Sequence, residues 1–482
     1  MAMLGGRAVA QPASAIPASA NPASANPAGR SSSVLGLPGV LGLSGMAISA
    51  VLLLLAVTTP EHAAAAGDVA AEVTAPDPAA EPGTESGFDA HHFAVWLSLL
   101  RSDALAKGIS PSTFDRSLEN VSPLPEVLER DRRQPEFTLT FSDYLRRTVT
   151  AKRIERGRAL LERHRGLLER VRARYGVQPR FLVAFWGLES NYGDHTGGFS
   201  VIPALVTLAY DERRAAFFRE QLIHALTILE QGHISLPAMS GSWAGAMGQL
   251  QFMPSTFTGY AVDGNGDGRR DIWTALPDVF TSAANFLASE GWRGTQTWGR
   301  EVRLSDDFDW QTTGLETRLP IAEWQAAGVR RADGTDLPRA EMTGSIIIPS
   351  GHLGQAFLVY DNFRTTLVWN RSILYAVAIG HLADRIAGKG PMVTAAGFSE
   401  TPMSRGDIER LQTRLNALGY DAGPPDGRAG RRTRAALKAF QSDRVLPADG
   451  HPNHQALAIL LEAGPCTSCK DGAPLEESNA KE

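Results

Sequence analysis

Cysteine is almost absent from this chain of 482 residues, which holds only Cys466 and Cys469. Two cysteines so close together cannot make a disulfide framework, so burial of apolar side chains must stabilise the fold. A large excess of charge is also absent, because the net charge at pH 7 is −5. A general nucleic-acid binder would need a strong positive excess, so we expect no nucleic acid among the partners.

The two cysteines allow two interpretations. Outside the cytoplasm they would close a small disulfide loop in the polar tail of the chain. Together with His451 and His454, which share their spacing, they would instead supply four ligands to zinc. Both histidines fall where we expect a loop that caps a helix, which makes the zinc site the less favoured interpretation.

One segment is locally basic. Residues 146–180 contain twelve Lys and Arg against three Asp and Glu. Such a face is usually only solvated, and the functional alternative is attraction to an anionic polymer or a membrane surface. An apolar stripe at helical spacing runs through the segment: Leu160, Leu161, Leu167, Leu168 and Val171.

The N-terminus has the pattern of an export signal. Residues 34–58 are almost wholly apolar, and four alanines at 63–66 follow. We therefore predict a signal peptide with a long n-region over residues 1–66, and a periplasmic location for the rest. The apolar run is also long enough to span a bilayer, so an uncleaved inner-membrane anchor is the alternative.

Composition and periodicity divide the remaining chain into a linker, a large domain and a small one. Residues 67–87 are rich in Ala, Pro, Glu and Asp and are predicted to be disordered. Residues 88–390 are predicted to be mainly α (α+β), with helices at 179–190, 202–231 and 373–386 and a few short strands within 296–348. After a linker at 391–403, residues 404–464 predict a three-helix binding module, followed by a polar tail at 465–482.

Glu189 is the first candidate catalytic residue. It lies in FWGLESNYG (185–193), near the end of an apolar helix that begins at Pro179 and is terminated by Asn191 and Gly193. A dry setting and the negative end of the helix dipole both disfavour the charged carboxylate. A carboxyl that stays protonated near neutral pH is what a general acid requires. The alternatives are a buried glutamate whose oxygens are satisfied by neighbouring backbone groups, and a glutamate that simply faces water.

The run SWAGAMGQLQFMP (242–254) is dense in small residues. Glycines at this density indicate close approach of backbone to backbone or of backbone to a ligand. Ser242 and Gln251 are the polar side chains best placed to reach a substrate. The alternative is a tightly packed turn and helix start that binds nothing.

Residues 263–271 fit the opening of an EF-hand calcium loop. Asp263, Asn265 and Asp267 occupy the first, third and fifth ligand positions, and a glycine follows at the sixth. Arg270 replaces the usual aliphatic residue, and Thr274 stands where a bidentate carboxylate is usual, so we expect weak or partial calcium binding. Asp278, from the following helix, would supply the missing carboxylate, and an Asp/Gly-rich surface turn is the alternative.

Taken together, these segments resemble the lytic murein transglycosylase B family, glycoside hydrolase family 103, over residues 88 to about 388. Residues 404–464 resemble the peptidoglycan-binding domain often attached to such enzymes, through LGY at 418–420, FQ at 440–441 and the DG pairs at 426 and 449. The segments that carry the first resemblance are RDRRQPEF (130–137), GLESNYG (187–193), the run at 242–254, the loop at 263–273 and VWNRS (368–372).

The resemblance implies a lysozyme-like helical fold that cleaves the β-1,4 bond between N-acetylmuramic acid and N-acetylglucosamine, without a cofactor for the chemistry. It implies that Glu189 is the single catalytic acid. The partners it implies are peptidoglycan glycan strands, and we expect a monomer. Ser242, Asn370, Gln251 and Tyr192 fall on substrate-binding positions, and Asp263, Asn265, Asp267, the carbonyl of Arg269 and Asp278 fall on the calcium loop.

The family chemistry needs one carboxyl, which acts first as acid and then as base to close a 1,6-anhydromuramyl ring. Two alternatives remain at this stage. A muramidase that hydrolyses the same bond would need a second carboxylate, and Asp194 is the only one close in sequence. A non-catalytic wall-binding protein would use the C-terminal module alone.

Overall fold

The computed structural model describes residues 89–132, 139–393 and 400–464. No helix within these ranges is long and apolar enough to cross a membrane. Several sequence predictions lie outside the described residues: the export signal or anchor at 1–66, the linker at 67–87, part of the 130–137 segment, both cysteines and the tail at 465–482.

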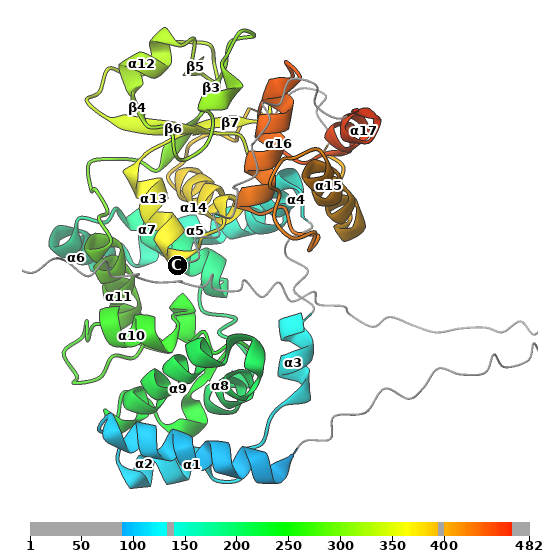
Figure 1. Ribbon diagram of the computed structural model, residues 1–482. Coiled ribbons are helices and arrows are strands. Elements are labelled where there is room, and N and C mark those ends of the chain that lie inside the picture. The colour runs from blue at the N-terminus through cyan, green and yellow to red at the C-terminus, as the bar shows by residue number, and fades with distance from the viewer. Residues whose placement is uncertain (1–88, 133–138, 394–399, 465–482) are drawn as a thin grey trace, which may run out of the picture. The chain divides into compact units, whose positions relative to one another are not determined.

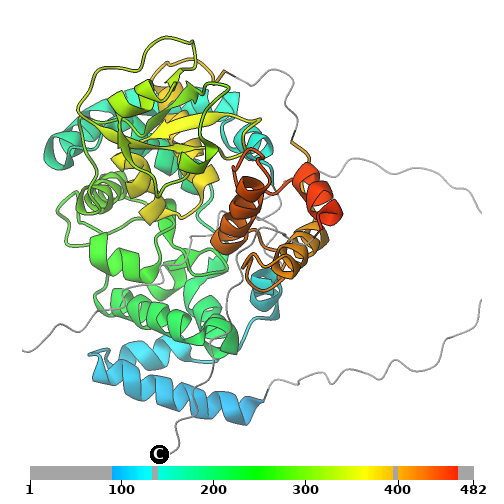
Figure 2. The ribbon, with the colours of Figure 1, turned by 45° about the horizontal axis from the view of Figure 1, so that its top comes forward.

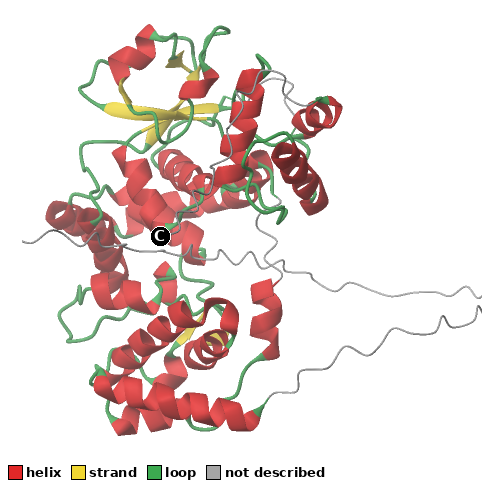
Figure 3. Ribbon diagram, viewed as in Figure 1, coloured by secondary structure: helices red, strands yellow, loops and turns green. Residues whose placement is uncertain are grey.

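Helices dominate the large domain, as the sequence predicts (Figure 3). Many begin at a side-chain cap or at a proline, which satisfies or removes free N–H groups at the helix start. The helices are α1 (Ala90–Ala106), α2 (Pro111–Leu118), α3 (Pro125–Arg132), α4 (Phe141–Thr148), α5 (Ala151–Arg163), α6 (Arg165–Tyr175), α7 (Pro179–Ser190), α8 (Val201–Tyr210), α9 (Ala215–Glu230), α10 (Pro254–Tyr260), α11 (Leu276–Ser289), α12 (Ile321–Ala326), α13 (Asp361–Trp369) and α14 (Ile373–Ile386), with short 3-10 turns η2 (Glu212–Arg214), η3 (Leu236–Ala238), η4 (Gly248–Leu250) and η5 (Trp310–Thr312).

The strands are short and belong to two antiparallel sheets. The larger sheet has the strand order β4-β6-β7-β3-β5 (Figure 1). Its core includes the fully buried Trp324 of α12, whose indole N–H donates to the carbonyl of Gly344 at 2.9 Å. The strands are β1 (Phe199–Ser200) paired with β2 (Ser240–Gly241), and β3 (Gly299–Arg303), β4 (Leu319–Pro320), β5 (Arg330–Arg331), β6 (Thr343–Ile347) and β7 (Ala356–Val359).

The C-terminal module has the three helices that the sequence predicts (Figure 2). They are α15 (Arg405–Ala417), α16 (Arg431–Asp443) and α17 (His454–Glu462), drawn orange to red. Leu411, Leu437, Phe440 and Leu460 are fully buried in their shared core. The module therefore has an apolar core of its own.

Two of the predicted helices, 179–190 and 373–386, have the observed bounds of α7 and α14, and the prediction of a mainly helical domain is confirmed. The single helix predicted at 202–231 is wrong: Asp211 is extended (ψ 129°), so the segment forms α8 and α9. Strands β3 to β6 lie within the predicted 296–348 region, but β7 lies beyond it. Strand β7 was missed because a four-residue apolar run carries no distinctive period.

The helix α7 is the centre of the large domain. From Phe181 to Leu188 every residue is buried, and α5, α6, α14 and η4 pack around it. A helix that is apolar on all sides is stable only when it is surrounded by other elements. Contacts between Glu189 and Tyr375, and between Arg180 and Asp384, show that α7 and α14 run antiparallel.

The packing of α14 against Trp298 leaves no space for a side chain at Gly380. A Cβ added there would lie 2.1 Å from the Trp298 ring. We therefore expect Gly380→Ala to lower the free energy of unfolding by about 1–3 kcal/mol through overpacking, although alanine has the higher helix propensity. Thermal or urea unfolding measures the change.

The matched control is Gly166→Ala in α6, where the nearest atom to an added Cβ is a guanidinium nitrogen of Arg170 at 3.7 Å. This variant should be as stable as the parent protein or slightly more stable. Equal stability of the two alanine variants would contradict the packing described for α14.

Candidate active site

Glu189 lies in the last turn of α7, where the sequence predicts it. The helix ends because Asn191, Tyr192 and Gly193 take positive φ values of 50°, 62° and 86°. The backbone N–H of Tyr192 closes the helix by donating to the carbonyl of Trp186 at 3.1 Å. This reversal places Glu189, at the end of the buried stretch 181–188, in a partly accessible position.

One carboxylate oxygen of Glu189 accepts two hydrogen bonds. The indole N–H of Trp369 donates to Oε1 at 2.8 Å, and the hydroxyl of Tyr375 donates to the same oxygen. Burial raises the pKa of Glu189 from 4.5 to about 7, and the two hydrogen bonds oppose that shift. The predicted rise of the pKa is thus confirmed, and burial is its cause.

Aromatic rings surround this carboxyl. The centroid of the Trp369 ring lies 4.5 Å from the ring centroid of Phe185, 5.2 Å from that of Phe252 and 5.0 Å from that of Phe286. These contacts join α7, the glycine-rich run, α11 and α13 at one point. The apolar wall they form excludes water from one side of Glu189, which accounts for its raised pKa.

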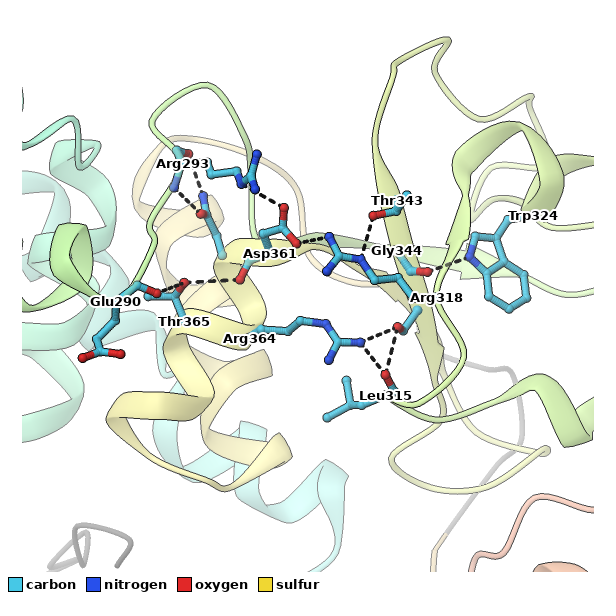
Figure 4. Close-up of polar contacts among 12 residues, drawn as sticks. Glu290, Arg293, Leu315, Arg318, Trp324, Thr343, Gly344, Asp361, Arg364 and Thr365 are labelled. Atoms are coloured by element: carbon cyan, nitrogen blue, oxygen red, sulfur yellow. Dashed lines mark hydrogen bonds and ion pairs between the residues drawn. The ribbon is translucent and has the colours of Figure 1, made fainter. Parts of the chain in front are cut away.

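Polar contacts fix the helix α13, which ends at Trp369 (Figure 4). At its start, the Asp361 carboxylate pairs with two arginines: the Nε of Arg293 lies 3.0 Å from one carboxylate oxygen, and Arg318 contacts the other. Arg318 also donates to the hydroxyl of Thr343 in β6. One turn on, Arg364 donates to the hydroxyl of Ser345 at 2.8 Å. The helix that carries the Glu189 contact is therefore held by the sheet.

The glycine-rich run packs backbone against backbone. A Cβ at Gly241 would lie 2.2 Å from the carbonyl oxygen of Ala246. The Ser242 hydroxyl accepts from the N–H of Ala246 at 3.0 Å, and Gln251, at φ 49°, donates to the carbonyl of Thr196 at 3.0 Å. Both side chains are buried within the turn.

Gln251 and Asn370 each adjoin a residue of the aromatic wall. Gln251 precedes Phe252, and Asn370 follows Trp369. The Asn370 side chain is buried, and its oxygen accepts from the N–H of Ser372 at 3.0 Å. The structure therefore brings the segments of these two predicted residues to Glu189.

Tyr192 has a different environment. Its ring is 4% exposed and packs edge-on against Trp186 at 5.5 Å. Its hydroxyl donates to the carbonyl of Arg153 at 2.7 Å, and the Arg156 guanidinium covers the ring. These contacts make Tyr192 a packing residue between α5 and α7.

Sequence reasoning missed three side chains that organise the site. Trp369 and Tyr375 contact Glu189 from nearly 200 positions away, and only the VWNRS segment hinted at the first. Gln249 is buried, accepts from the Trp186 indole at 2.7 Å and donates to the carbonyl of Trp273 at 2.7 Å. It thereby joins α7 to the segment that follows the predicted calcium loop.

The predicted calcium loop is closed by its own hydrogen bonds. Asp263 accepts from the N–H groups of Gly266 at 2.6 Å and Gly268 at 2.8 Å. Asp278, fully buried in the first turn of α11, accepts from Gly264 at 2.9 Å and from Asp271 at 2.7 Å. Asp278 thus reaches the loop from the following helix. Within the described ranges, no three His, Cys, Asp or Glu side chains are gathered closely enough to form a metal site.

The oxygen donors of the loop nevertheless fit a hard cation. Asp263, Asn265 and Asp267 lie on one turn, and the carbonyl of Arg269 follows. Carboxylate, amide and carbonyl oxygens are the ligands that Ca²⁺ takes. The donor chemistry therefore fits calcium, with Asp278 as the carboxylate from the next helix.

The histidines of the alternative zinc set have other contacts. His451 Nε2 lies 3.3 Å from a carboxylate oxygen of Glu400, and His454 Nε2 lies 3.3 Å from the carbonyl of Pro402. The two cysteines lie outside the described residues. In the basic segment, several charges are paired on the surface, such as Arg156 with Asp194 and Arg172 with Glu169.

Comparisons with known proteins identify the family of this chain. Residues 92–384 match the transglycosylase SLT domain family, and residues 404–460 match the putative peptidoglycan binding domain. The first match covers more than half of the chain. The chain belongs to the transglycosylase SLT family. The recognised resemblance to lytic transglycosylases with a peptidoglycan-binding domain is thereby confirmed.

Solved structures of this family are similar in fold. SltB3 from Pseudomonas aeruginosa, in complex with NAG-anhNAM-pentapeptide, is 45% identical with a TM-score of 0.74, over 77% of this chain and 99% of that one. The soluble lytic transglycosylase SltB1 of the same organism is 28% identical with a TM-score of 0.55, over 62% and 98%. The lytic transglycosylase Slt35 of Escherichia coli, in complex with calcium, is 26% identical with a TM-score of 0.54, over 60% and 92%.

A curated relative is the membrane-bound lytic murein transglycosylase B of Escherichia coli (strain K12), which is 29% identical over 246 residues. The match covers 51% of this chain and 66% of that relative, so the chain spans just under two thirds of its length. These relatives are lytic transglycosylases, which are peptidoglycan-cleaving enzymes. Membership of the family places this chain among such enzymes, with a lysozyme-like fold.

The raised pKa of Glu189 has a cost in stability. A carboxyl whose pKa rises on folding destabilises the protein above its unfolded pKa, since the buried group must then ionise or keep a proton that the unfolded chain releases. Because the pKa of Glu189 rises from 4.5 to about 7 on folding, this cost in stability is on the order of 3 kcal/mol above pH 7 and vanishes below pH 4.5. We therefore expect Glu189→Gln to be more stable than the parent enzyme at pH 8 and equal to it at pH 4.

Urea unfolding at both pH values measures this difference. Glu126→Gln, at an exposed glutamate of α3, is the control and should change stability little at either pH. A stability difference between Glu189→Gln and the parent that does not depend on pH would contradict the raised pKa.

Proposed function

We propose that Glu189 cleaves the β-1,4 bond between N-acetylmuramic acid and N-acetylglucosamine as the only catalytic carboxyl, and releases a 1,6-anhydromuramyl end. The observation that carries this proposal is the pair of donors on one oxygen of a partly buried carboxyl whose pKa is about 7. Such a group is poised to give a proton and then to take one at neutral pH.

The two roles follow in order. Protonated Glu189 first gives its proton to the glycosidic oxygen, so that the bond to the anomeric carbon breaks and N-acetylglucosamine leaves with a hydroxyl. The resulting carboxylate is stabilised by the donors Trp369 and Tyr375. It then removes the proton of the muramyl C6 hydroxyl, whose oxygen bonds to the anomeric carbon. The substrate's acetamido group shields the positive charge between the two steps.

Asp194 is unsuited to be the second carboxylate that the competing muramidase mechanism requires. Both oxygens of Asp194 contact the guanidinium of Arg156, one at 2.8 Å, and Asn191 donates to it at 3.1 Å. These contacts lower the pKa of Asp194 and hold its carboxylate against α5. A carboxylate committed to an ion pair is a poor base for water, which favours the anhydro product.

Ser242, Gln251 and Asn370 support substrate binding through their segments. We infer that Gln251 and Asn370, beside Phe252 and Trp369, bind sugar hydroxyls and N-acetyl groups next to Glu189. Ser242 belongs to the same hairpin as Phe252, because Met247 bridges to both Gly241 and Phe252. Tyr192 supports this set indirectly by packing beneath the end of α7.

We also infer that the loop at 263–269 binds calcium for structure. The donor set fits, and the calcium complex of Slt35 belongs to the same fold. An ion held there would fix the chain that runs from Asp271 to Trp273, and Trp273 accepts from Gln249 beside α7. Its effect would therefore reach the catalytic helix through packing.

The place of action follows from the substrate. The apolar run at 34–58 and the alanines after it support export to the periplasm, where peptidoglycan lies. The same run supports retention at the inner membrane when it is not cleaved. The peptidoglycan-binding module at 404–460 keeps the enzyme, as a monomer, on glycan strands.

Digestion of purified sacculi followed by mass spectrometry tests the reaction. We expect soluble muropeptides that are one water lighter than hydrolysis products. Glu189→Gln should lower the rate by about 10²–10⁴-fold, because it removes both the acid and the base. Asp194→Asn is the matched control and should retain the anhydro products. Products that carry the added water would establish hydrolysis instead.

Removal of calcium tests whether the loop binds the ion, and the readout is the melting temperature of the protein and not its turnover. We expect a chelator to lower the melting temperature of the protein, and added calcium to restore it. Asp263→Asn should abolish this response, while Asp306→Asn, at an exposed aspartate outside the loop, should retain it. An identical melting curve with and without chelator would exclude a calcium site here.

A further inference from the structure

A polar cavity lies away from Glu189. It has a volume of about 410 Å³, and its lining comes from β3, β5, the end of α14 and the residues that follow α14. Tyr375 contacts Glu189 at one end of α14, and Asp384 lines the cavity nine residues on, about 14 Å along the helix. The cavity is therefore distinct from the catalytic centre.

The cavity lies beside the start of β3, where no strand of the described residues pairs on the side away from β7. On one side β3 pairs with β7 from Gly299 to Val302, whereas on the other side β5 pairs only with Val302 and Arg303. The carbonyl of Trp298 accepts from Tyr360, so it points to the β7 side. Because backbone groups alternate along a strand, the N–H and C=O groups of Gly299 and Glu301 point away from β7. Those of Gly299 lie beyond the last pair with β5, whereas the carbonyl of Glu301 faces the residue that follows β5.

Residues 389–393, which follow α14, do not pair with β3 through their backbone. Within the described ranges, no backbone–backbone hydrogen bond joins residues 389–393 to β3. Their contact is instead the N–H of Val393, which donates to the Glu301 carboxylate at 2.6 Å. The hydroxyl of Thr297 in the lining is buried and has no hydrogen-bond partner among the described residues.

The charges of the lining favour an anion. Arg300 and Arg331 lie within 4 Å of no carboxylate in the described part of the chain, and Lys389 pairs with Asp384 at 2.9 Å. Burial raises the pKa of Glu301 to about 7 and lowers that of His381 to about 4. At neutral pH the histidine is thus uncharged and Glu301 is only partly ionised, so the cations are in excess.

We propose that this cavity binds a short extended peptide with a free C-terminal carboxylate, which adds as a strand to the edge of β3. Backbone hydrogen bonds to Gly299 and to the N–H of Glu301 would hold the chain, and Arg331 and Lys389 would hold the carboxylate. The inference rests on the proposed function, because the stem peptides of peptidoglycan have this chemistry. It assigns the enzyme a peptide site separate from its glycan site.

Calorimetric titration of the full-length Glu189→Gln protein with a synthetic stem pentapeptide tests the proposal without turnover. We expect the free-acid peptide to bind, and its C-terminal amide to bind about tenfold more weakly because the charge is lost. A peptide methylated at an internal backbone nitrogen should also bind more weakly, since it cannot complete the strand pairing.

The diagnostic variant is Arg331→Glu, and the matched control is Arg339→Glu, an exposed arginine outside the lining. In the Glu189→Gln background, Arg331→Glu should lower the affinity for the peptide by about tenfold, and Arg339→Glu should lower it by less than twofold. Absence of binding at millimolar peptide, equal binding of acid and amide, or equal effects of the two substitutions would each overturn the proposal.

The proposed reaction is tested separately on glycan strands stripped of peptide. With Glu189 intact, Arg331→Glu should cleave these strands to anhydro products at the parental rate. If the parent forms no anhydro product, the proposed reaction fails whatever the peptide does. If it forms that product but binds no peptide, only the second site fails.

Discussion

The burial of α7 from Phe181 to Leu188 is the constraint on which the rest of the structure depends. A helix without a polar face must be covered on every side, and α5, α6, α14 and η4 provide that cover. Glu189 is the acidic residue at its end, so the same packing that stabilises the helix desolvates the carboxyl. The chemistry of the site is therefore a consequence of core packing.

The contacts of Glu189 balance two opposing demands. A dry environment alone would keep the carboxyl protonated, and it would then serve as an acid but not as a base. The donors Trp369 and Tyr375 stabilise the carboxylate and hold its pKa at about 7. Placing both on one oxygen leaves the other without a hydrogen-bond partner among the described residues, free to exchange a proton with the substrate.

The sheet contributes to the site from a distance. Asp361, through Arg318, and Arg364 attach α13 to the sheet, and α13 carries Trp369 to Glu189. Among the described residues, the start of β3 also has no strand partner on the side away from β7, beside a cationic cavity. The larger sheet thus positions the contact between Trp369 and Glu189, and its strand β3 provides the backbone groups of the proposed peptide site.

Local pattern in the sequence determined the helical class, the bounds of α7 and α14, the three helices of the C-terminal module and the position of Glu189. These features depend on caps, prolines, turn residues and apolar periodicity, which act over a few residues. The sequence also indicated that Glu189 would be dry, because its neighbours are apolar.

Only the tertiary structure decided which groups meet Glu189, that Asp194 is paired with Arg156, and that Tyr192 packs in the core. These outcomes depend on segments that lie far apart in the chain, such as Trp369 and Tyr375 from α13 and α14. Whether a side chain faces a ligand or a backbone carbonyl is a matter of where neighbouring elements pack. Local periodicity has no information about that geometry, because it describes one element at a time.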